Sequence, residues 1–312
     1  MKLNKPDFWQ KKESFISLIL LPFSFFLLML IWFKKKISNE KKFNLPVLCI
    51  GNIYIGGTGK TPLSILIAKE LQKIEKKPVI IKKFYDEHND EHLLIKKNNI
   101  PLITKKNRKD AILSADNKFD LVILDDGFQD FKIKKNMSVL CFHGNQLIGN
   151  GRLFPSGPLR ESLNALQRAE MVLINGKKNV NFENKLYGIN QKLKIFYSRY
   201  NLINIQKYKD KNILAFAGIG NADNFFDLLR SNNLKVKHSI SFPDHYNFKK
   251  NEIIKIVEKA KNADCTILTT EKDFLRIEKY NFSEINSCPV ELEILEKEKF
   301  IKSIKAVYDK SY

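Results

Sequence analysis

Cysteine is scarce in this chain of 312 residues, and the cysteines present form no Cys-x-x-Cys pair. Their positions (Cys49, Cys141, Cys265 and Cys288) argue against a zinc site or a disulfide framework and indicate reduced thiols in a cytosolic compartment. Arginine is scarce too, so lysine supplies most of the formal net charge of +20. That excess is typical of a biased genome, but it also favours anionic partners such as phospholipid headgroups or a phosphorylated substrate. The chain lacks a basic stripe interleaved with aromatic residues, so we expect no nucleic-acid partner.

Charge is missing altogether from Phe15–Phe33, a mainly apolar run with lysines on both sides. A helix rises about 1.5 Å per residue, so this run matches the roughly 30 Å hydrocarbon core of a bilayer. We therefore predict a membrane-associated helix within residues 1–38. Because Pro22 and Ser24 interrupt the run, the helix could span the bilayer or lie in one leaflet. A buried helix and a cleaved signal peptide are the alternatives, although no small-x-small cleavage site follows the run.

Short apolar segments alternate with helical stretches over the next part of the chain. The segments expected to be strands are Leu45–Ile50, Pro78–Ile81, Phe119–Leu124, Ser138–Phe142 and Met171–Ile174. Continuous apolar runs of this length are typical of strands covered on both faces. Their alternation with helices predicts an α/β fold with a doubly wound parallel sheet.

A glycine-rich turn separates the first of these strands from a helical stretch. The full Walker A pattern is G-x-x-x-x-G-K-[ST]; here Tyr54 takes the first glycine position, and the remainder is intact from Gly56 to Thr61. Such a loop turns backbone N–H groups toward phosphates, while Lys60 would bridge the β- and γ-phosphate oxygens and Thr61 would ligate Mg²⁺. The residues expected to bind the nucleotide are Tyr54, Ile55, Gly56, Gly57, Thr58, Gly59, Lys60 and Thr61. We assign residues 39–175 to a P-loop NTPase-like kinase domain that binds ATP with Mg²⁺.

A second, smaller α/β domain is predicted over residues 212–312. It has strands at Ile213–Ala217, Lys235–Ser241 and Thr266–Thr269 and a helical run at Lys249–Ala263. The intervening residues 176–211, rich in lysine and asparagine, are predicted to form a linker.

Acidic and basic side chains follow the apolar strands at two further places. Asp125 and Asp126 end the strand at Phe119–Leu124 and fit a Walker B site, whose carboxylate holds Mg²⁺ directly or through water. A pair of solvated acids capping a strand is the alternative. The segment Gly149–Glu161 is dense in turn formers, which alone explain a loop, whereas its two arginines favour recognition of phosphate or carboxylate.

Taken together, these pieces resemble the tetraacyldisaccharide 4′-kinase family, the lipid A kinases of Gram-negative bacteria. Six sequence blocks of that family occur here in the right order. They are G-N-x-x-x-G-G-x-G-K-T-P at Gly51–Pro62, L-D-D-G-[LF]-Q at Leu124–Gln129, G-N-G-R-L-x-P-x-G-P-L-R-E at Gly149–Glu161, A-F-A-G-I-G at Ala215–Gly220, D-H-[HY] at Asp244–Tyr246 and T-T-E-K-D at Thr269–Asp273.

The resemblance implies an enzyme that moves the γ-phosphate of ATP to the 4′-hydroxyl of lipid A disaccharide 1-phosphate, giving lipid IVA. It implies a glycolipid substrate, contact with the membrane surface, and an active site on the cytoplasmic face of the inner membrane. The family's proposed base is an Asp in a G-D-E segment, which matches Asp90, working with the histidine that matches His245. Glu91 beside that Asp is expected to join Asp125, Asp126 and Thr61 at the metal, and Arg108 matches an arginine that reaches toward the active site. No obligate protein partner is evident.

One feature departs from the family pattern, and another bears on a rival function. The family's S-R-G-Y-G block is replaced by Lys82-Lys83-Phe84-Tyr85, with a shortened path to Asp90, so we expect a reduced covering loop. The main rival is a regulatory or partitioning ATPase with a deviant P-loop. That class needs a lysine directly before the paired glycines, and this chain has Ile55 there.

Overall fold

The computed structural model describes residues 6–84 and 89–309; the segment 85–88 in the shortened path, Tyr85 included, lies outside them. The chain divides into two compact units, which are described separately here. Of the described residues, the larger unit takes 6–84, 99–199 and 293–309, and the smaller unit takes 89–98 and 200–292.

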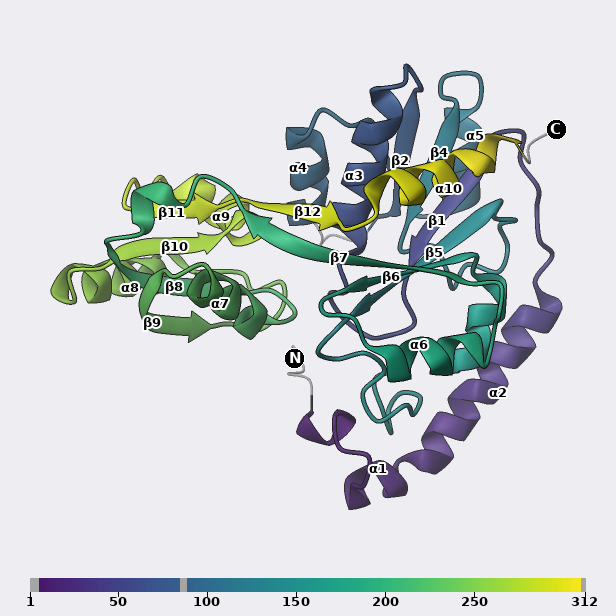
Figure 1. Cartoon of the computed structure of the whole chain (residues 1–312), viewed down its shortest axis with the longest axis horizontal. Helices are drawn as coiled ribbons and strands as arrows, with labels where there is room; N and C mark the ends of the chain where they lie inside the picture. Colours follow the sequence, from purple (N-terminus) through teal and green to yellow (C-terminus); the bar gives the residue numbers. More distant parts are fainter. Residues whose placement is uncertain (1–5, 85–88, 310–312) are drawn as a thin grey trace. The chain divides into compact units, whose positions relative to one another are not determined.

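An eight-stranded sheet, in the order β12-β7-β6-β5-β1-β4-β2-β3, lies mainly in the larger unit, and residues 200–202 of β7 and 290–292 of β12 fall in the smaller unit (Figure 1). The strands are β1 (Val47–Gly51), β2 (Pro78–Lys83), β3 (Leu102–Lys105), β4 (Leu121–Asp125), β5 (Met137–His143), β6 (Met171–Asn175), β7 (Lys194–Leu202) and β12 (Val290–Ile294). From β3 to β7 every neighbouring pair is parallel. Strands β1 and β4 are buried throughout, as their continuous apolar sequences predict. The predicted α/β fold with a mostly parallel sheet is therefore confirmed.

Helices accompany this sheet as the alternation of segments predicts. They are α3 (Lys60–Gln72), α5 (Arg108–Ala115), α6 (Val180–Tyr187) and α10 (Lys297–Asp309). Strand β1 lies at the centre, between β4 and β5, and its register pairs Ile50 with Asp125. The carboxyl ends of β1 and β4 therefore bring the glycine turn and the paired aspartates to one edge of the sheet.

The smaller unit contains a four-stranded sheet in the order β11-β10-β8-β9, with parallel neighbours. Its strands are β8 (Asn212–Ala217), β9 (Lys235–Ser241), β10 (Thr266–Thr270) and β11 (Ile285–Cys288), and its helices are α4 (Asn89–Lys97), α7 (Ala222–Ser231), α8 (Lys250–Asn262) and α9 (Glu271–Ile277). The fully buried Phe216 and the buried Phe248 pack edge to face in its core, with ring centroids 5.6 Å apart.

The division into units differs from the predicted domain boundaries in three ways. Residues 176–199, with α6 and most of β7, belong to the larger unit and do not form a separate linker. The C-terminal α10 belongs to the larger unit, where Phe300 packs on Phe196 of β7 with ring centroids 5.2 Å apart. Helix α4, which carries Asp90, belongs to the smaller unit. All three differences depend on contacts between segments that are far apart in the sequence, and the composition of a short segment does not reveal such contacts.

The N-terminal apolar run forms two helices, α1 (Phe15–Ile19) and α2 (Leu21–Ile37), rather than the single helix expected (Figure 1). Pro22 lies in the first turn of α2, where its missing N–H is tolerated while the ring disfavours a continuous helix through the preceding residue. Within residues 6–84 and 89–309, no helix is both long and apolar enough to cross a membrane.

The two helices bury small polar residues and expose large apolar ones. Ser17 donates a hydrogen bond to the carbonyl oxygen of Ser156 (2.6 Å), and Ser24 donates one to that of Leu153 (2.8 Å). Both acceptors lie in the loop that contains the G-N-G-R-L sequence. The outward side chains are half or more exposed, among them Phe15, Ile19, Phe23, Phe25, Trp32 and Phe33. The run therefore packs against this loop through its serines and leaves its large apolar side chains exposed.

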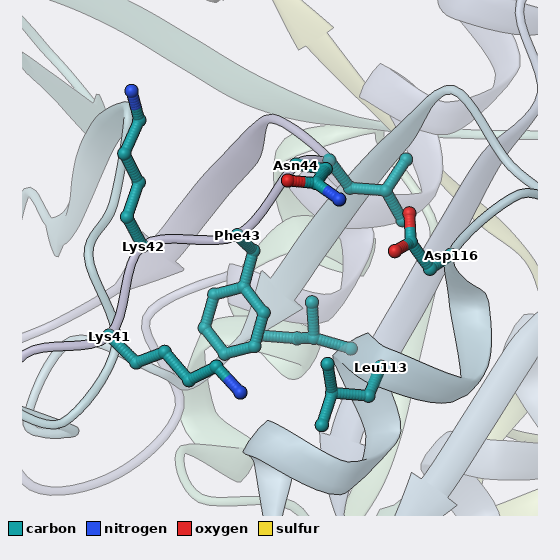
Figure 2. A pocket seen from close by; sticks show the side chains of 8 residues that line it. Lys41, Lys42, Phe43, Asn44, Leu113 and Asp116 are labelled. Atoms are coloured by element: carbon teal, nitrogen blue, oxygen red, sulfur yellow. The ribbon is translucent and has the colours of Figure 1, made fainter.

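A pocket is lined by residues that precede β1 and by residues at the end of α5 (Figure 2). Phe43, which precedes β1, and Leu113, near the end of α5, contribute its apolar walls. Because β1 and β4 are parallel, the end at which β1 begins is remote from the carboxyl ends of the strands, where ligands of such sheets bind. The pocket is not part of the phosphate site.

Candidate phosphoryl-transfer site

The glycine turn after β1 is held in a loop conformation by a buried asparagine. The Asn52 side chain donates hydrogen bonds to the Gly56 carbonyl (3.1 Å) and the Thr58 hydroxyl (3.0 Å). Gly59, just before α3, has a left-handed backbone (φ 88°) that other residues rarely adopt. A Cβ atom added at Gly57 would meet nothing within 4 Å, so this side of the loop is open. The loop is thus shaped, before any ligand binds, to accept phosphates at the start of a helix.

Tyr54 and Ile55, the first two residues expected to bind the nucleotide, make hydrogen bonds within the protein. Tyr54 is 1% exposed, and its hydroxyl accepts a hydrogen bond from Gln10 (2.7 Å), so its ring belongs to the core. The Ile55 N–H donates to the Pro158 carbonyl (2.8 Å). The loop after β5 therefore runs beside the phosphate loop and supports it.

Three charged groups gather at the mouth of this loop. Lys60 Nζ lies 3.7 Å from Asp126 Oδ1, and Arg160 Nη1 lies 3.0 Å from the same oxygen. Burial alone would raise the pKa of Asp126, but the charges of Lys60, Arg160 and Lys82 outweigh it and hold that pKa well below its usual range. Asp126 is therefore ionised at neutral pH and orients both cations. Arg160 was not among the predicted site residues, although the arginines of the segment Gly149–Glu161 favoured recognition of phosphate or carboxylate.

The Thr61 hydroxyl and the Asp125 carboxylate meet beneath the phosphate loop. Thr61 donates a hydrogen bond to Asp125 Oδ2 (2.9 Å), and Lys82 Nζ lies 2.6 Å from that oxygen and 3.3 Å from the Thr61 hydroxyl. The other oxygen, Asp125 Oδ1, is buried and has no hydrogen-bond partner among the residues described. Hydroxyl and carboxylate oxygens are the donors that Mg²⁺ prefers, and an unsatisfied buried carboxylate oxygen fits a bound metal or its water.

No group of three His, Cys, Asp or Glu side chains suited to a metal occurs in the part of the chain that the structure covers. Magnesium bound here would take few protein ligands and draw the rest from water and nucleotide phosphates, as it does in kinases. Glu91, expected as a fourth ligand, belongs to the smaller unit and pairs with Lys272 Nζ at 2.6 Å.

Arg108, expected to contact the nucleotide, is placed behind the turn that follows β4. Its guanidinium donates to the backbone carbonyl of Asp126 (2.8 Å) and lies 3.7 Å from Asp130. Asp126 has a left-handed backbone (φ 59°), which is uncommon outside glycine although Asp adopts it more readily than most residues. Arg108 therefore stabilises the turn that aims the Asp126 carboxylate.

The smaller unit brings the other expected catalytic residues together. Asp90 on α4 is 3% exposed; its Oδ1 lies 3.4 Å from His245 Nδ1, and its Oδ2 lies 2.6 Å from Arg276 Nη2. Arg276 Nη2 is also 3.3 Å from His245 Nδ1, so the donor guanidinium and the acceptor carboxylate compete for one ring nitrogen. Asp90 Oδ1 has no well-formed hydrogen bond among the residues described and can accept a proton.

Arg276 and Asp273 hold this cluster to the sheet of the smaller unit. Asp273 lies 2.6 Å from Arg276 Nη1 and accepts a hydrogen bond from the Gly218 N–H (2.9 Å). Arg276 in turn donates to the Gly218 carbonyl (2.7 Å). Sequence reasoning missed both Arg276 and Lys272; the only signal was their position in, or just after, the T-T-E-K-D block.

The pKa of Asp90 leads to a prediction for the pH profile. Burial alone would raise that pKa, but the contact with His245 and the charges of Lys272 and Arg276 lower it well below its usual range. A depressed folded-state pKa stabilises the fold above the unfolded value of about 3.9, and this stabilisation is lost as pH falls through the folded value. We therefore expect Asp90 to give no acid limb in kcat/KM above about pH 5. The measurement is kcat/KM against pH in the natural chain. An acid limb above about pH 5 that moves to another pH in Asp90→Glu would belong to Asp90 and contradict its depressed pKa.

The parallel sheet with a glycine loop, a basic side chain on that loop and a carboxylate on the neighbouring strand defines the P-loop class of nucleotide-binding proteins. A family model described as Tetraacyldisaccharide-1-P 4′-kinase matches residues 16–309. The chain belongs to that family.

Individual relatives agree with the family match. The chain is 40% identical over 318 residues to "Tetraacyldisaccharide 4′-kinase" of Pelagibacter ubique, covering all of both chains, and 31% identical over 317 residues to the protein of the same name from Rickettsia felis, covering 94% of each. The crystal structure of LpxK from Aquifex aeolicus in complex with ATP superposes with a TM-score of 0.72 at 24% identity, covering 94% of this chain and 99% of that one. That structure shares the fold.

Proposed function

We propose that this chain transfers the γ-phosphate of ATP to the 4′-hydroxyl of lipid A disaccharide 1-phosphate, giving lipid IVA. The observation that carries the proposal is the preformed phosphate loop with Lys60–Asp126 and Thr61–Asp125 beside it, in a chain of the tetraacyldisaccharide 4′-kinase family. The test is to incubate purified protein with Mg-ATP and the disaccharide and to look for a bisphosphorylated product. A deviant P-loop partitioning ATPase would instead hydrolyse ATP without requiring the glycolipid.

The residues of the larger unit hold and polarise the triphosphate. Lys60 and the N–H groups of the glycine loop neutralise charge on the transferring phosphoryl group, and Arg160 adds a second cation held by Asp126. Thr61 and Asp125 would hold Mg²⁺, which supplies positive charge to the phosphate oxygens when bound. Because phosphoryl transfer needs little covalent chemistry from the protein, these positioned charges account for most of the stabilisation.

Asp90 accepts the proton of the 4′-hydroxyl in this proposal, and His245 and Arg276 position its carboxylate. A depressed pKa makes Asp90 a weak base, which suits a loose transition state in which the hydroxyl proton leaves late. The Asp90 carboxylate, ionised at neutral pH because its pKa is depressed, is the group that receives the proton. Arg276 pairs with Oδ2 of Asp90, and this ion pair restricts rotation of the carboxylate.

The exposed apolar face of α1 and α2 is the proposed membrane-docking surface, at the cytoplasmic face of the inner membrane where ATP is available. Phe15 is 77% exposed and Phe25 is 71% exposed, and a contiguous apolar patch of this kind marks an interaction site. The helices end in Lys34, Lys35 and Lys36, which favour anionic headgroups. Interfacial helices with apolar faces and flanking lysines bind in this way.

Replacing Phe15, Phe25 and Phe33 together by glutamate is expected to release the protein from membranes. Each buried phenylalanine contributes about 1.5–3 kcal/mol, so losing three should weaken partitioning at least about 100-fold. The measurement is cosedimentation with vesicles of phosphatidylethanolamine and phosphatidylglycerol. The matched control replaces the exposed Ile74, Leu113 and Val180 of the same unit by glutamate and should leave vesicle binding unchanged. Equal release of both variants would mean that charge, not this face, governs binding.

A further inference from the structure

A buried lysine contacts the two groups that P-loop proteins offer to Mg²⁺. Lys82 lies near the end of β2, where the pairing of Ile81 with Leu124 places it beside Asp125. Only 5% of its side chain is exposed, and none of the Asp125 side chain. The ammonium group lies 2.6 Å from Asp125 Oδ2 and 3.3 Å from the Thr61 hydroxyl.

This contact conflicts with metal binding at the same atoms. Asp125 Oδ2 already accepts hydrogen bonds from Thr61 and from Lys82. Mg²⁺ held by these same oxygens would place a second cation close to the buried ammonium. Two cations this close repel each other strongly where water is excluded.

We propose that Lys82 is a tethered cation that competes with Mg²⁺ for Asp125 and Thr61. In nucleotide-free protein it neutralises the buried Asp125 carboxylate, which would otherwise be costly. When Mg²⁺ arrives with the nucleotide, the flexible stem of Lys82 lets its ammonium leave the two oxygens. Metal affinity is thereby lowered, and the metal is held mainly when phosphate oxygens contribute ligands. The inference rests on the proposed use of Mg²⁺.

The first test measures Mn²⁺ binding to the ADP complex by electron paramagnetic resonance. A unit charge within about 4–6 Å changes proton affinity by about 1–3 pKa units, so Lys82→Met should bind Mn²⁺ at least about tenfold more tightly than the natural chain. The control is Lys105→Met, which removes the same charge from the exposed end of β3, the neighbour of β2. Equal Mn²⁺ affinity in Lys82→Met and the natural chain overturns the competition. Absence of Mn²⁺ binding in every ADP complex overturns instead the proposed metal use.

The second test measures the melting temperature without nucleotide. It remains informative when Lys82→Met lowers the stability of the fold. Lys82→Met leaves a buried carboxylate unpaired, and its melting temperature should fall. Millimolar Mn²⁺ should raise that temperature by several degrees because the metal replaces the lost cation, and it should leave the natural chain nearly unchanged. A variant that stays unstable in Mn²⁺ contradicts a shared site for the lysine and the metal.

Discussion

Lys60→Met is expected to lower the single-turnover rate of phosphoryl transfer by about 10³-fold, the largest effect of any substitution in the larger unit. Removing one preorganised donor from a developing negative charge typically costs about 10²–10³-fold, and Lys60 also carries a full charge. The fold should survive, because Asp126 keeps its ion pair with Arg160 at 3.0 Å. The measurement is rapid-quench transfer of labelled phosphate from ATP to the disaccharide.

Lys69→Met is the matched control for this experiment. It removes the same charge from the last turn of the same helix, α3, beyond the phosphate loop. We expect its rate to stay within about twofold of the natural chain, as for surface substitutions away from special features. A Lys60→Met protein that transfers phosphate at the control rate would remove Lys60 from the phosphate site.

Asp90→Asn is expected to reduce kcat by about 10²–10⁴-fold, the usual contribution of a positioned base, with a much smaller change in KM. The amide keeps the shape of the carboxylate but cannot take the hydroxyl proton. Arg276 retains a partner in Asp273 at 2.6 Å, so the cluster should hold together. Steady-state kinetics with varied disaccharide separate the two constants.

Two controls accompany this variant. Asp223→Asn makes the same chemical change at an exposed position in the first turn of α7 and should leave kcat unchanged. A thermal melt of Asp90→Asn measures any loss of stability, because the buried carboxylate also pairs with Arg276. Full activity in a folded Asp90→Asn protein would show that another group removes the proton.

The phosphate loop and its carboxylate could be predicted because their chemistry is local. Gly56–Thr61 and Asp125-Asp126 each follow an apolar strand, and parallel strands bring their carboxyl ends to one edge. The roles of Lys82 and Arg276 could not be predicted this way, since each meets its partner through the pairing or packing of distant elements. The role expected of Asp90 rests on family resemblance alone, and for His245 the sequence adds only a position just past the end of a strand.

The N-terminal run shows the same limit from another side. Its composition predicts an apolar helix. The hydrogen bonds of Ser17 and Ser24 could not be predicted, because their acceptors lie in a loop far along the sequence. The compact units differ from the predicted domain boundaries for a related reason. Residues 176–211 look polar because β7 is exposed along one face, yet its buried Phe196 and Ser198 complete the sheet.

The loop after β5 joins the apolar helices to the phosphate loop. One end accepts the serine hydrogen bonds of α1 and α2, and the other receives the Ile55 N–H at 2.8 Å. On the proposed docking, the ATP site therefore stays at a fixed height above the bilayer, and the acceptor is met by lateral diffusion. Turnover should then follow the mole fraction of glycolipid in the surface, and diluting it with inert lipid should slow the enzyme at constant bulk concentration.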